Sequence, residues 1–222
     1  MIIIGLTGSI GMGKSKAASV LRRFGVAVSD ADAVVHRLMA PGGAAVAPVN
    51  AAFPGVVRNG AVDRAMLGQL VFGDPAALRR LEKIVHPLVG RERDRFLRRA
   101  AVRRLRLVAF DVPLLFETGG ERRCDAVVLV SAPAFIQAAR VLRRPGMTPT
   151  RLAKIRAQQL PNQAKRRRAE FVVETGLGLR TSLRGLAAIV KLLRGRTPRQ
   201  WPPARQPRWK AQRYYARNRP RY

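Results

Sequence analysis

The stretch Gly8-Ser9-Ile10-Gly11-Met12-Gly13-Lys14-Ser15 decides the fold of this 222-residue chain. It fits the pattern G-x-x-x-x-G-K-S at every specified position, and the apolar, β-branched run Ile2–Thr7 precedes it. After it, apolar residues recur at helical spacing until Gly25, which predicts a helix over Lys14–Phe24. The order strand, glycine loop, helix indicates a phosphate-binding loop.

Such a loop binds phosphate for a physical reason. Its glycines let the backbone curl so that successive N–H groups face an anion, and the start of the helix adds roughly half a positive charge. The motif assigns Lys14 to the β- and γ-phosphates of a nucleotide and the hydroxyl of Ser15 to Mg²⁺. A glycine-rich turn with a surface lysine is the alternative, which the flanking strand and helix disfavour.

The rest of the body alternates short buried strands with amphipathic helices. The further strands are expected at Val26–Ser29, Leu107–Asp111, Ala126–Ser131 and Phe171–Glu174. The further helices are expected at Ala134–Arg143, Thr148–Gln159 and Ser182–Leu193. This alternation predicts an α/β fold, a doubly wound parallel sheet flanked by helices.

Strand signals nearly vanish between Ala33 and Arg104. Proline and glycine residues there separate three helical patterns, at Met66–Phe72, Ala76–Ile84 and Leu88–Arg104. We therefore expect an inserted helical lobe.

Two carboxylates, Asp30 and Asp32, follow the second predicted strand. In parallel α/β sheets the carboxyl ends of the strands line the ligand crevice. Residues two apart in an extended segment point the same way, so both carboxylates are expected to serve one site, as metal anchor and as acceptor of a hydroxyl proton. The alternative is that Asp32 only caps a helix starting at Ala33.

The chain is strongly basic, and its charge is unevenly distributed. Lys and Arg number 43 against 13 Asp and Glu, which gives a formal net charge of +30. Residues 196–222 hold eight Arg and Lys210 without an acid, interleaved with Trp and Tyr. We expect this tail to be disordered until it binds an anionic partner, such as RNA or an anionic surface.

The apolar runs, the start of the sequence and the cysteine content bear on the cellular location of the protein. The longest apolar runs are far shorter than the roughly 18 residues of a membrane-spanning helix, and no basic segment precedes an apolar one at the start. The single Cys124 cannot form an internal disulfide. These features favour a cytoplasmic protein.

Several segments, in order, resemble the dephospho-CoA kinase family. The resemblance covers residues 2–195, and its most specific elements are His86-Pro87 and Pro113-Leu114-Leu115. The matching segments are Ile4–Ser15, Ser29–Asp32, Val62–Arg64, Leu81–Pro87, Asp111–Glu117 and Ala169–Val173. Lys16 and Glu170 depart from the family, which commonly has Thr and Asp at these positions.

The resemblance implies a P-loop kinase fold that transfers the γ-phosphoryl group of MgATP to the ribose 3′-hydroxyl of dephospho-CoA. The implied kinase domain, residues 1–195, has a nucleotide-binding core (1–32, 105–139 and 165–195), a substrate lobe (33–104) and a lid (140–164). Asp32 would be the catalytic base, and His86 would contact dephospho-CoA. Mg²⁺ would bind Ser15, with Asp30 as a further candidate. ATP would contact Gly8, Ser9, Ile10, Gly11, Met12, Gly13, Lys14, Ser15, Lys16, Arg140 and Arg144.

Two other functions compete with this reading. One is a P-loop kinase of a nucleoside monophosphate or another metabolite, which the paired aspartates and His86-Pro87 disfavour. The other is a nucleic-acid-binding P-loop ATPase, which would explain the basic tail. Asp111 ends a predicted strand as a metal-organising carboxylate would, but a turn residue before Pro113 explains it equally well, so its role is left open.

Overall fold

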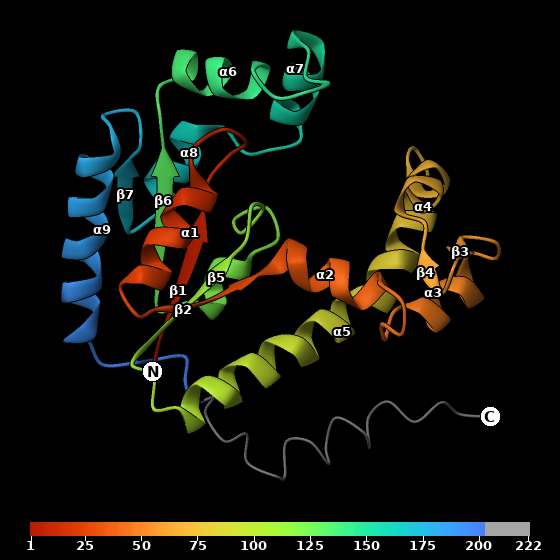
Figure 1. The fold of residues 1–222 in the computed structure, drawn as a ribbon, viewed down its shortest axis with the longest axis horizontal. Helices are drawn as coiled ribbons and strands as arrows, with labels where there is room; N and C mark the ends of the chain where they lie inside the picture. Colours follow the sequence, from red (N-terminus) through yellow and green to blue (C-terminus); the bar gives the residue numbers. More distant parts are fainter. Residues whose placement is uncertain (203–222) are drawn as a thin grey trace, which may run out of the picture.

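The computed structural model describes residues 1–202, which fold around a five-stranded parallel sheet (Figure 1). The strand order is β2-β5-β1-β6-β7, which confirms the predicted α/β class. The strands are β1 (Ile2–Thr7), β2 (Ala27–Asp30), β5 (Leu107–Asp111), β6 (Ala126–Ser131) and β7 (Phe171–Glu174). Four of the five have the predicted bounds, and β2 is displaced by one residue.

Alternating side chains of the central strands pack on opposite faces of the sheet, as the two-residue period of a strand requires. Ile4 and its even-numbered neighbours in β1 pack against α1 (Lys14–Arg23) and α9 (Leu179–Arg194). Ile3 packs on the other face, against the end of α5 (Pro75–Val102). The phosphate-binding loop therefore starts from a strand that is buried on both sides.

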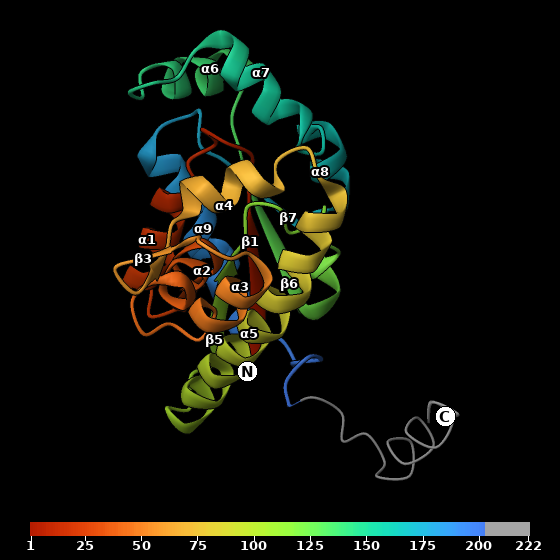
Figure 2. The same cartoon turned by 90° about the vertical axis from the view of Figure 1, so that its right-hand side faces the viewer.

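A second group of elements forms the predicted lobe beside the sheet (Figures 1 and 2). It has its own core, in which Val49 and Val56 are fully buried. The lobe comprises α2 (Ala31–Met39), α3 (Val46–Ala52), β3 (Val57–Arg58), β4 (Ala61–Val62), α4 (Arg64–Val71) and the first half of α5. The β3–β4 hairpin is absent from the sequence-based prediction, because strands of two residues leave too little alternation to detect. The helix α3 is absent too, because its seven residues span only about two turns.

One correction concerns Pro87. The sequence predicts two helices separated by this proline, whereas α5 runs without interruption from Pro75 to Val102. A proline inside a helix costs about 3 kcal/mol. Apolar contacts at both ends of α5 oppose that cost, since Val85 packs in the lobe core and Leu97 packs against the sheet.

Two short helices, α6 (Ala134–Leu142) and α7 (Pro149–Ala157), stand beyond the carboxyl ends of the strands, where a lid is expected (Figure 1). The chain returns to the sheet through α8 (Asn162–Arg168). A 3₁₀ turn, η1 (Gly120–Arg123), precedes β6. The boundaries assigned to core, lobe and lid stay predictions.

A buried ion pair anchors the return from the lid. The ammonium of Lys165 is fully buried in α8 and lies 2.8 Å from Oε1 of Glu117, an ion pair without the alignment of a hydrogen bond. The same oxygen accepts a hydrogen bond from the backbone N–H of Leu160 at 2.9 Å. Burial opposes the charge of Glu117, but Lys165 and Leu160 together lower the pKa of its carboxyl. The stabilisation is therefore present above about pH 4.5 and is lost as the pH falls through the lowered pKa.

The start of the C-terminal tail is ordered, which corrects the prediction for residues 196–202. One carboxylate, Asp125, holds both ends of the described chain. Its Oδ2 accepts from the N–H of Ile3 at 2.7 Å, and its Oδ1 accepts from Arg199 at 2.6 Å and Gln200 at 2.9 Å. Trp201 packs against the cluster that contains Ile3. Residues 203–222 lie outside the described structure, so the expected disorder there stays a prediction.

No helix within residues 1–202 is long and apolar enough to cross a membrane. The cytoplasmic location inferred from the sequence stays a prediction.

Replacing Lys165 with Met should lower the free energy of unfolding by about 3–5 kcal/mol, because Glu117 is left as an uncompensated buried charge. The double variant Lys165→Met/Glu117→Leu should recover most of that loss. Urea unfolding of the two variants measures both values. A double variant that is no more stable than Lys165→Met would mean that the two side chains do not act as a pair.

Replacing Asp125 with Ala should lower the free energy of unfolding by about 2–4 kcal/mol, because three backbone N–H groups lose a charged acceptor. Asp94→Ala is the matched control, since within residues 1–202 the more exposed carboxylate of Asp94 pairs only with half-buried Arg93. That control should change stability by less than about 0.5 kcal/mol. Equal urea midpoints for the two variants would contradict the anchoring role of Asp125.

Candidate active site

The loop between β1 and α1 has the backbone that its glycines predict. Gly13 precedes α1 with a φ of 89°, a left-handed conformation that favours glycine. At Gly8 a side chain has no room, since a Cβ would lie 2.4 Å from Cγ2 of Val130. The residues between β1 and α1 therefore adopt the tight curve of a phosphate-binding loop.

Lys14, the first residue of α1, reaches across to the neighbouring strand. Its Nζ lies 2.5 Å from Oδ1 of Asp111, the last residue of β5, whose side chain is 3% exposed. Burial raises the pKa of Asp111, while the Lys14 ammonium opposes that rise. Asp111, whose role the sequence left open, thus holds the loop lysine at the carboxyl end of the sheet.

The structure corrects the interpretation of the paired aspartates. Asp30 ends β2 and caps α2, because its Oδ1 accepts from the N–H of Ala33 at 3.0 Å. Asp32 lies in the first turn of α2, so the two residues do not share one extended segment. The helix cap considered for Asp32 is therefore made by Asp30.

Asp32 instead lines a cavity of about 340 Å³. The other walls come from the segment after β5, with Pro113 and Leu114, and from the residues that follow α7, Gln158 and Gln159. The charges of Asp30 and Asp32 both act to raise the pKa of Asp111, so the three carboxylates share one electrostatic environment. Within residues 1–202 no three acidic, His or Cys side chains are grouped closely enough to hold a metal alone.

A second cavity, of about 530 Å³, lies on the outer side of the loop. Predicted ATP contacts gather there, because Gly11, Gly13, Lys16, Arg140 and Arg144 all line it. The structure thus brings the two predicted lid arginines to the same cavity as the loop. The segment after β7, including Thr175, closes the opposite wall.

Thr175 links this cavity to the loop, a role that the sequence analysis missed. Arg140 donates to the backbone carbonyl of Thr175 at 2.7 Å and to its Oγ1 at 3.1 Å. The Thr175 hydroxyl in turn donates to the carbonyl of Met12 at 2.7 Å. Only a family pattern or a structure reveals such a residue, since a threonine after a strand carries no distinctive signal.

Two glutamines beyond the sheet hold Ile10 of the loop, and the sequence analysis missed both. The N–H of Ile10 donates to Oε1 of Gln159 at 3.2 Å, and its carbonyl accepts from Nε2 of Gln137 at 2.8 Å. Arg156 of α7 donates to Oε1 of Gln137 at 2.7 Å. The amide oxygen of Gln159 thus occupies a loop N–H group of the kind that binds phosphate.

His86 lies apart from these groups. It occupies the middle of α5, where it is exposed, rather than a helix end. It lines neither of the two cavities described above. Its contact with dephospho-CoA stays a prediction.

The arrangement suits transfer of a phosphoryl group. One cavity abuts the phosphate-binding loop and two arginines, and the other contains an exposed carboxylate. Phosphoryl transfer depends on positioning and on positive charge around the transferred group, both of which these residues supply.

Comparisons with known proteins agree with this geometry. The model of the family described as Dephospho-CoA kinase matches residues 2–179. A protein of that name from Paramagnetospirillum magneticum is 63% identical over 199 residues, which cover 89% of this chain and 93% of the relative. Another, from Rhodospirillum rubrum, is 59% identical over 201 residues, covering 90% and 95%.

A solved structure gives the same result for the fold. The protein TT1252 from Thermus thermophilus superposes with a TM-score of 0.74 at 37% identity, covering 86% of this chain and 96% of that one. The dephospho-CoA kinase of Campylobacter jejuni, at 18% identity and a TM-score of 0.63, covers 87% and 97% and shares the fold. On this evidence the chain belongs to the dephospho-CoA kinase family.

Proposed function

We propose that this kinase transfers the γ-phosphoryl group of ATP to the ribose 3′-hydroxyl of dephospho-CoA, giving coenzyme A and ADP. Family membership gives the two substrates. One observation carries the mechanism. Asp32 follows β2 and the loop lysine, Lys14, follows β1, so both lie at the carboxyl ends of the parallel strands. The acceptor then occupies the Asp32 cavity, and ATP occupies the cavity between the loop and Arg140.

Asp32 is the general base in this proposal. Its side chain is exposed to the acceptor cavity, whereas one oxygen of Asp30 is already engaged in the helix cap. A carboxylate within hydrogen-bond reach of the 3′-hydroxyl accepts its proton as the oxygen attacks phosphorus. The bond from phosphorus to the bridging oxygen of ADP then breaks, and ADP leaves with that electron pair.

Lys14 supplies positive charge to the transferred group. Its ammonium pairs with buried Asp111 and so points along the carboxyl end of the sheet rather than into solvent. When phosphates enter the loop, the ammonium contacts their β- and γ-oxygens, where negative charge is spread in the transition state. Asp111 is then a positioning residue for Lys14.

The nucleotide cavity supports roles for the remaining predicted residues. Arg140 and Arg144 face the loop and stabilise charge on the phosphates, with Lys16 on the same wall. A phosphate oxygen entering the loop competes with Gln159 for the N–H of Ile10. Release of that glutamine would couple ATP binding to movement of α7.

The residues present fit a magnesium ion. Mg²⁺ commonly uses one or two carboxylates together with substrate phosphates rather than a complete protein cage. The carboxylates of Asp30, Asp32 and Asp111 lie close enough to influence one another's charge, and Asp111 contacts the first turn of α1. Their oxygens are the hard donors that Mg²⁺ prefers. Ser15 and Asp30 would hold the ion, which when bound neutralises phosphate charge.

Product analysis tests the proposal. Purified protein is incubated with dephospho-CoA, ATP and magnesium chloride, and the products are separated and weighed by mass spectrometry. A product one phosphate heavier than dephospho-CoA is expected, together with an equal amount of ADP. ATP consumption without that product would overturn the assignment of the acceptor.

Lys14→Ala should reduce phosphoryl transfer by at least about 10³-fold, because the phosphates lose their loop cation. The chain should still fold but be less stable, since Asp111 loses its buried partner while the loop backbone is unaltered. Circular dichroism and the coupled ADP assay measure the two properties separately. Near-normal turnover would contradict the role of Lys14.

Asp32→Asn should lower turnover by roughly 10²–10⁴-fold while changing ATP affinity only a few-fold, because only the proton acceptor is removed. Asp30→Asn is the matched control, since asparagine caps helices as well as aspartate does. That control should raise the magnesium requirement and lower turnover far less. If both variants lose turnover equally at saturating magnesium, Asp32 is not the base.

A further inference from the structure

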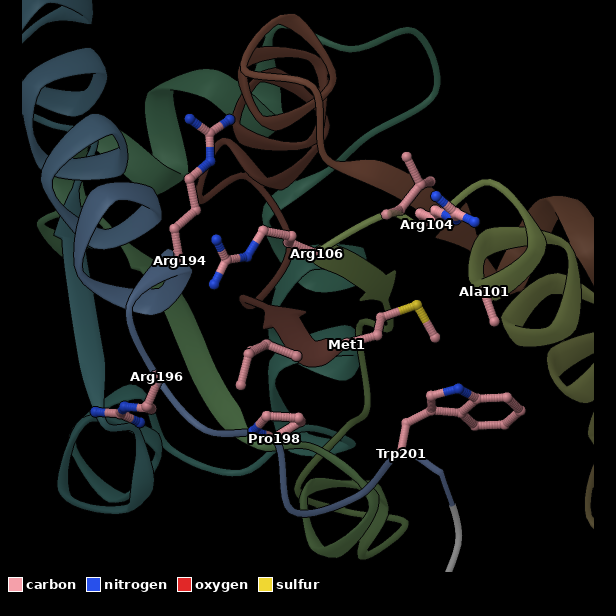
Figure 3. Close-up of a pocket in the computed structure, with 10 residues that line it drawn as sticks. Met1, Ala101, Arg104, Arg106, Arg194, Arg196, Pro198 and Trp201 are labelled. Atoms are coloured by element: carbon pink, nitrogen blue, oxygen red, sulfur yellow. The ribbon is translucent and has the colours of Figure 1, made fainter.

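A basic cavity lies at the amino ends of the strands, whereas the candidate active site lies at their carboxyl ends. It has a volume of about 340 Å³, and Met1 and Ile2, at the start of β1, form part of its wall. Because β1 has six residues, this cavity is roughly 20 Å from the loop at its other end. Four arginines line it and no acidic residue does, as Figure 3 shows for Arg104, Arg106, Arg194 and Arg196.

Two of these arginines are available to a ligand. Arg104 and Arg106 are exposed, and within residues 1–202 neither side chain makes a hydrogen bond or an ion pair that meets the usual distance limits. Arg194 donates to the carbonyl of Phe24 at 2.8 Å, and Arg196 pairs with Glu170. Arg104 also has a φ of 52°, a conformation that glycine adopts with less strain.

The positive charge continues into a second hollow. This neighbouring cavity, of about 470 Å³, is lined by Arg23, Lys191 and Arg194. Arg194 belongs to both cavities, so six cationic side chains line the two hollows together. This number of cations suits several phosphates of one chain rather than a single anion.

An aromatic side chain completes the first cavity. Trp201 forms part of its wall and is half-buried (Figure 3). The segment that carries it is fixed by the hydrogen bonds of Arg199 and Gln200 to Asp125. In sequence, Trp201 leads into residues 203–222, which contain six Arg and Lys210, no acid, and four further Trp or Tyr residues.

We propose that this face binds single-stranded nucleic acid, with phosphates on Arg104 and Arg106 and a base stacked on Trp201. Basic grooves combined with aromatic side chains are the usual means of binding single strands, because every base has a face that stacks. A duplex keeps its bases stacked on one another and cannot offer one to Trp201. The kinase site lies at the carboxyl ends of the strands, so both ligands can bind together.

The test uses the full chain and a fluorescein-labelled 12-nucleotide oligouridine, with binding followed by anisotropy between 50 and 200 mM salt. Arg104→Gln/Arg106→Gln should reduce the slope of log affinity against log salt by about 1.4, since each phosphate contact on a single strand contributes about 0.7. Arg79→Gln/Arg80→Gln removes the same charge from exposed positions at the far end of α5 and should leave the slope unchanged.

The stacking contact is tested separately. Trp201→Ala should weaken binding about tenfold without altering the salt slope, whereas Trp201→Phe should keep most of the affinity. Turnover of dephospho-CoA should be unchanged in all of these variants, which shows that they are folded.

Three results would overturn the proposal. Equal losses in the two double-arginine variants would show that only net charge matters. A 12-base-pair duplex that binds as tightly as the single strand would exclude stacking. Binding to phosphatidylglycerol vesicles without binding to the oligouridine would assign the face to an anionic membrane surface.

Discussion

The register of three parallel strands is the constraint on which the site depends. Asp30 at the end of β2 is paired with Asp111 at the end of β5, and Asp111 is paired with Leu6 of β1. The phosphate-binding loop starts two residues after Leu6, so it necessarily emerges beside two carboxylates. A shift of one residue in the pairing of β1 with β5 would turn Asp111 to the other face relative to β1 and remove the partner of Lys14. A shift in the pairing of β2 with β5 would instead move Asp30 away from Asp111.

The groups around the loop form a connected hydrogen-bond network. Arg140 donates to Thr175, whose hydroxyl donates to the carbonyl of Met12. Ile10 accepts a hydrogen bond from Gln137 and donates one to Gln159. On the acceptor side, the pair Glu117–Lys165 fixes the segment that carries Pro113 against α8. These contacts tie both cavities to the segments that enter and leave α6 and α7.

The sequence predicts the sheet and the loop well because their signals are local. A buried strand such as Leu107–Asp111 is a continuous apolar run, and the glycine-lysine motif has a fixed spacing. The alternative of a helix cap was considered for the wrong aspartate, Asp32, because either aspartate is a good helix cap and only the helix start at Ala31 decides between them. Pro87 and residues 196–202 were misjudged since their conformations depend on distant partners, Leu97 with the sheet and Asp125 respectively. Gln159 was missed for the same reason, as its partner Ile10 is 149 residues away.

The central claim is that the acceptor hydroxyl, the base Asp32 and the ATP phosphates come together at the carboxyl ends of the parallel strands. A crystal structure with a non-hydrolysable ATP analogue and dephospho-CoA tests this claim most directly. The account predicts that the ribose 3′-oxygen lies within hydrogen-bond distance of the Asp32 carboxylate, in line with the γ-phosphorus. It also predicts that Nζ of Lys14 contacts the phosphates and that Gln159 has released Ile10. A 3′-oxygen bound away from Asp32, with Lys14 still paired only to Asp111, would contradict it.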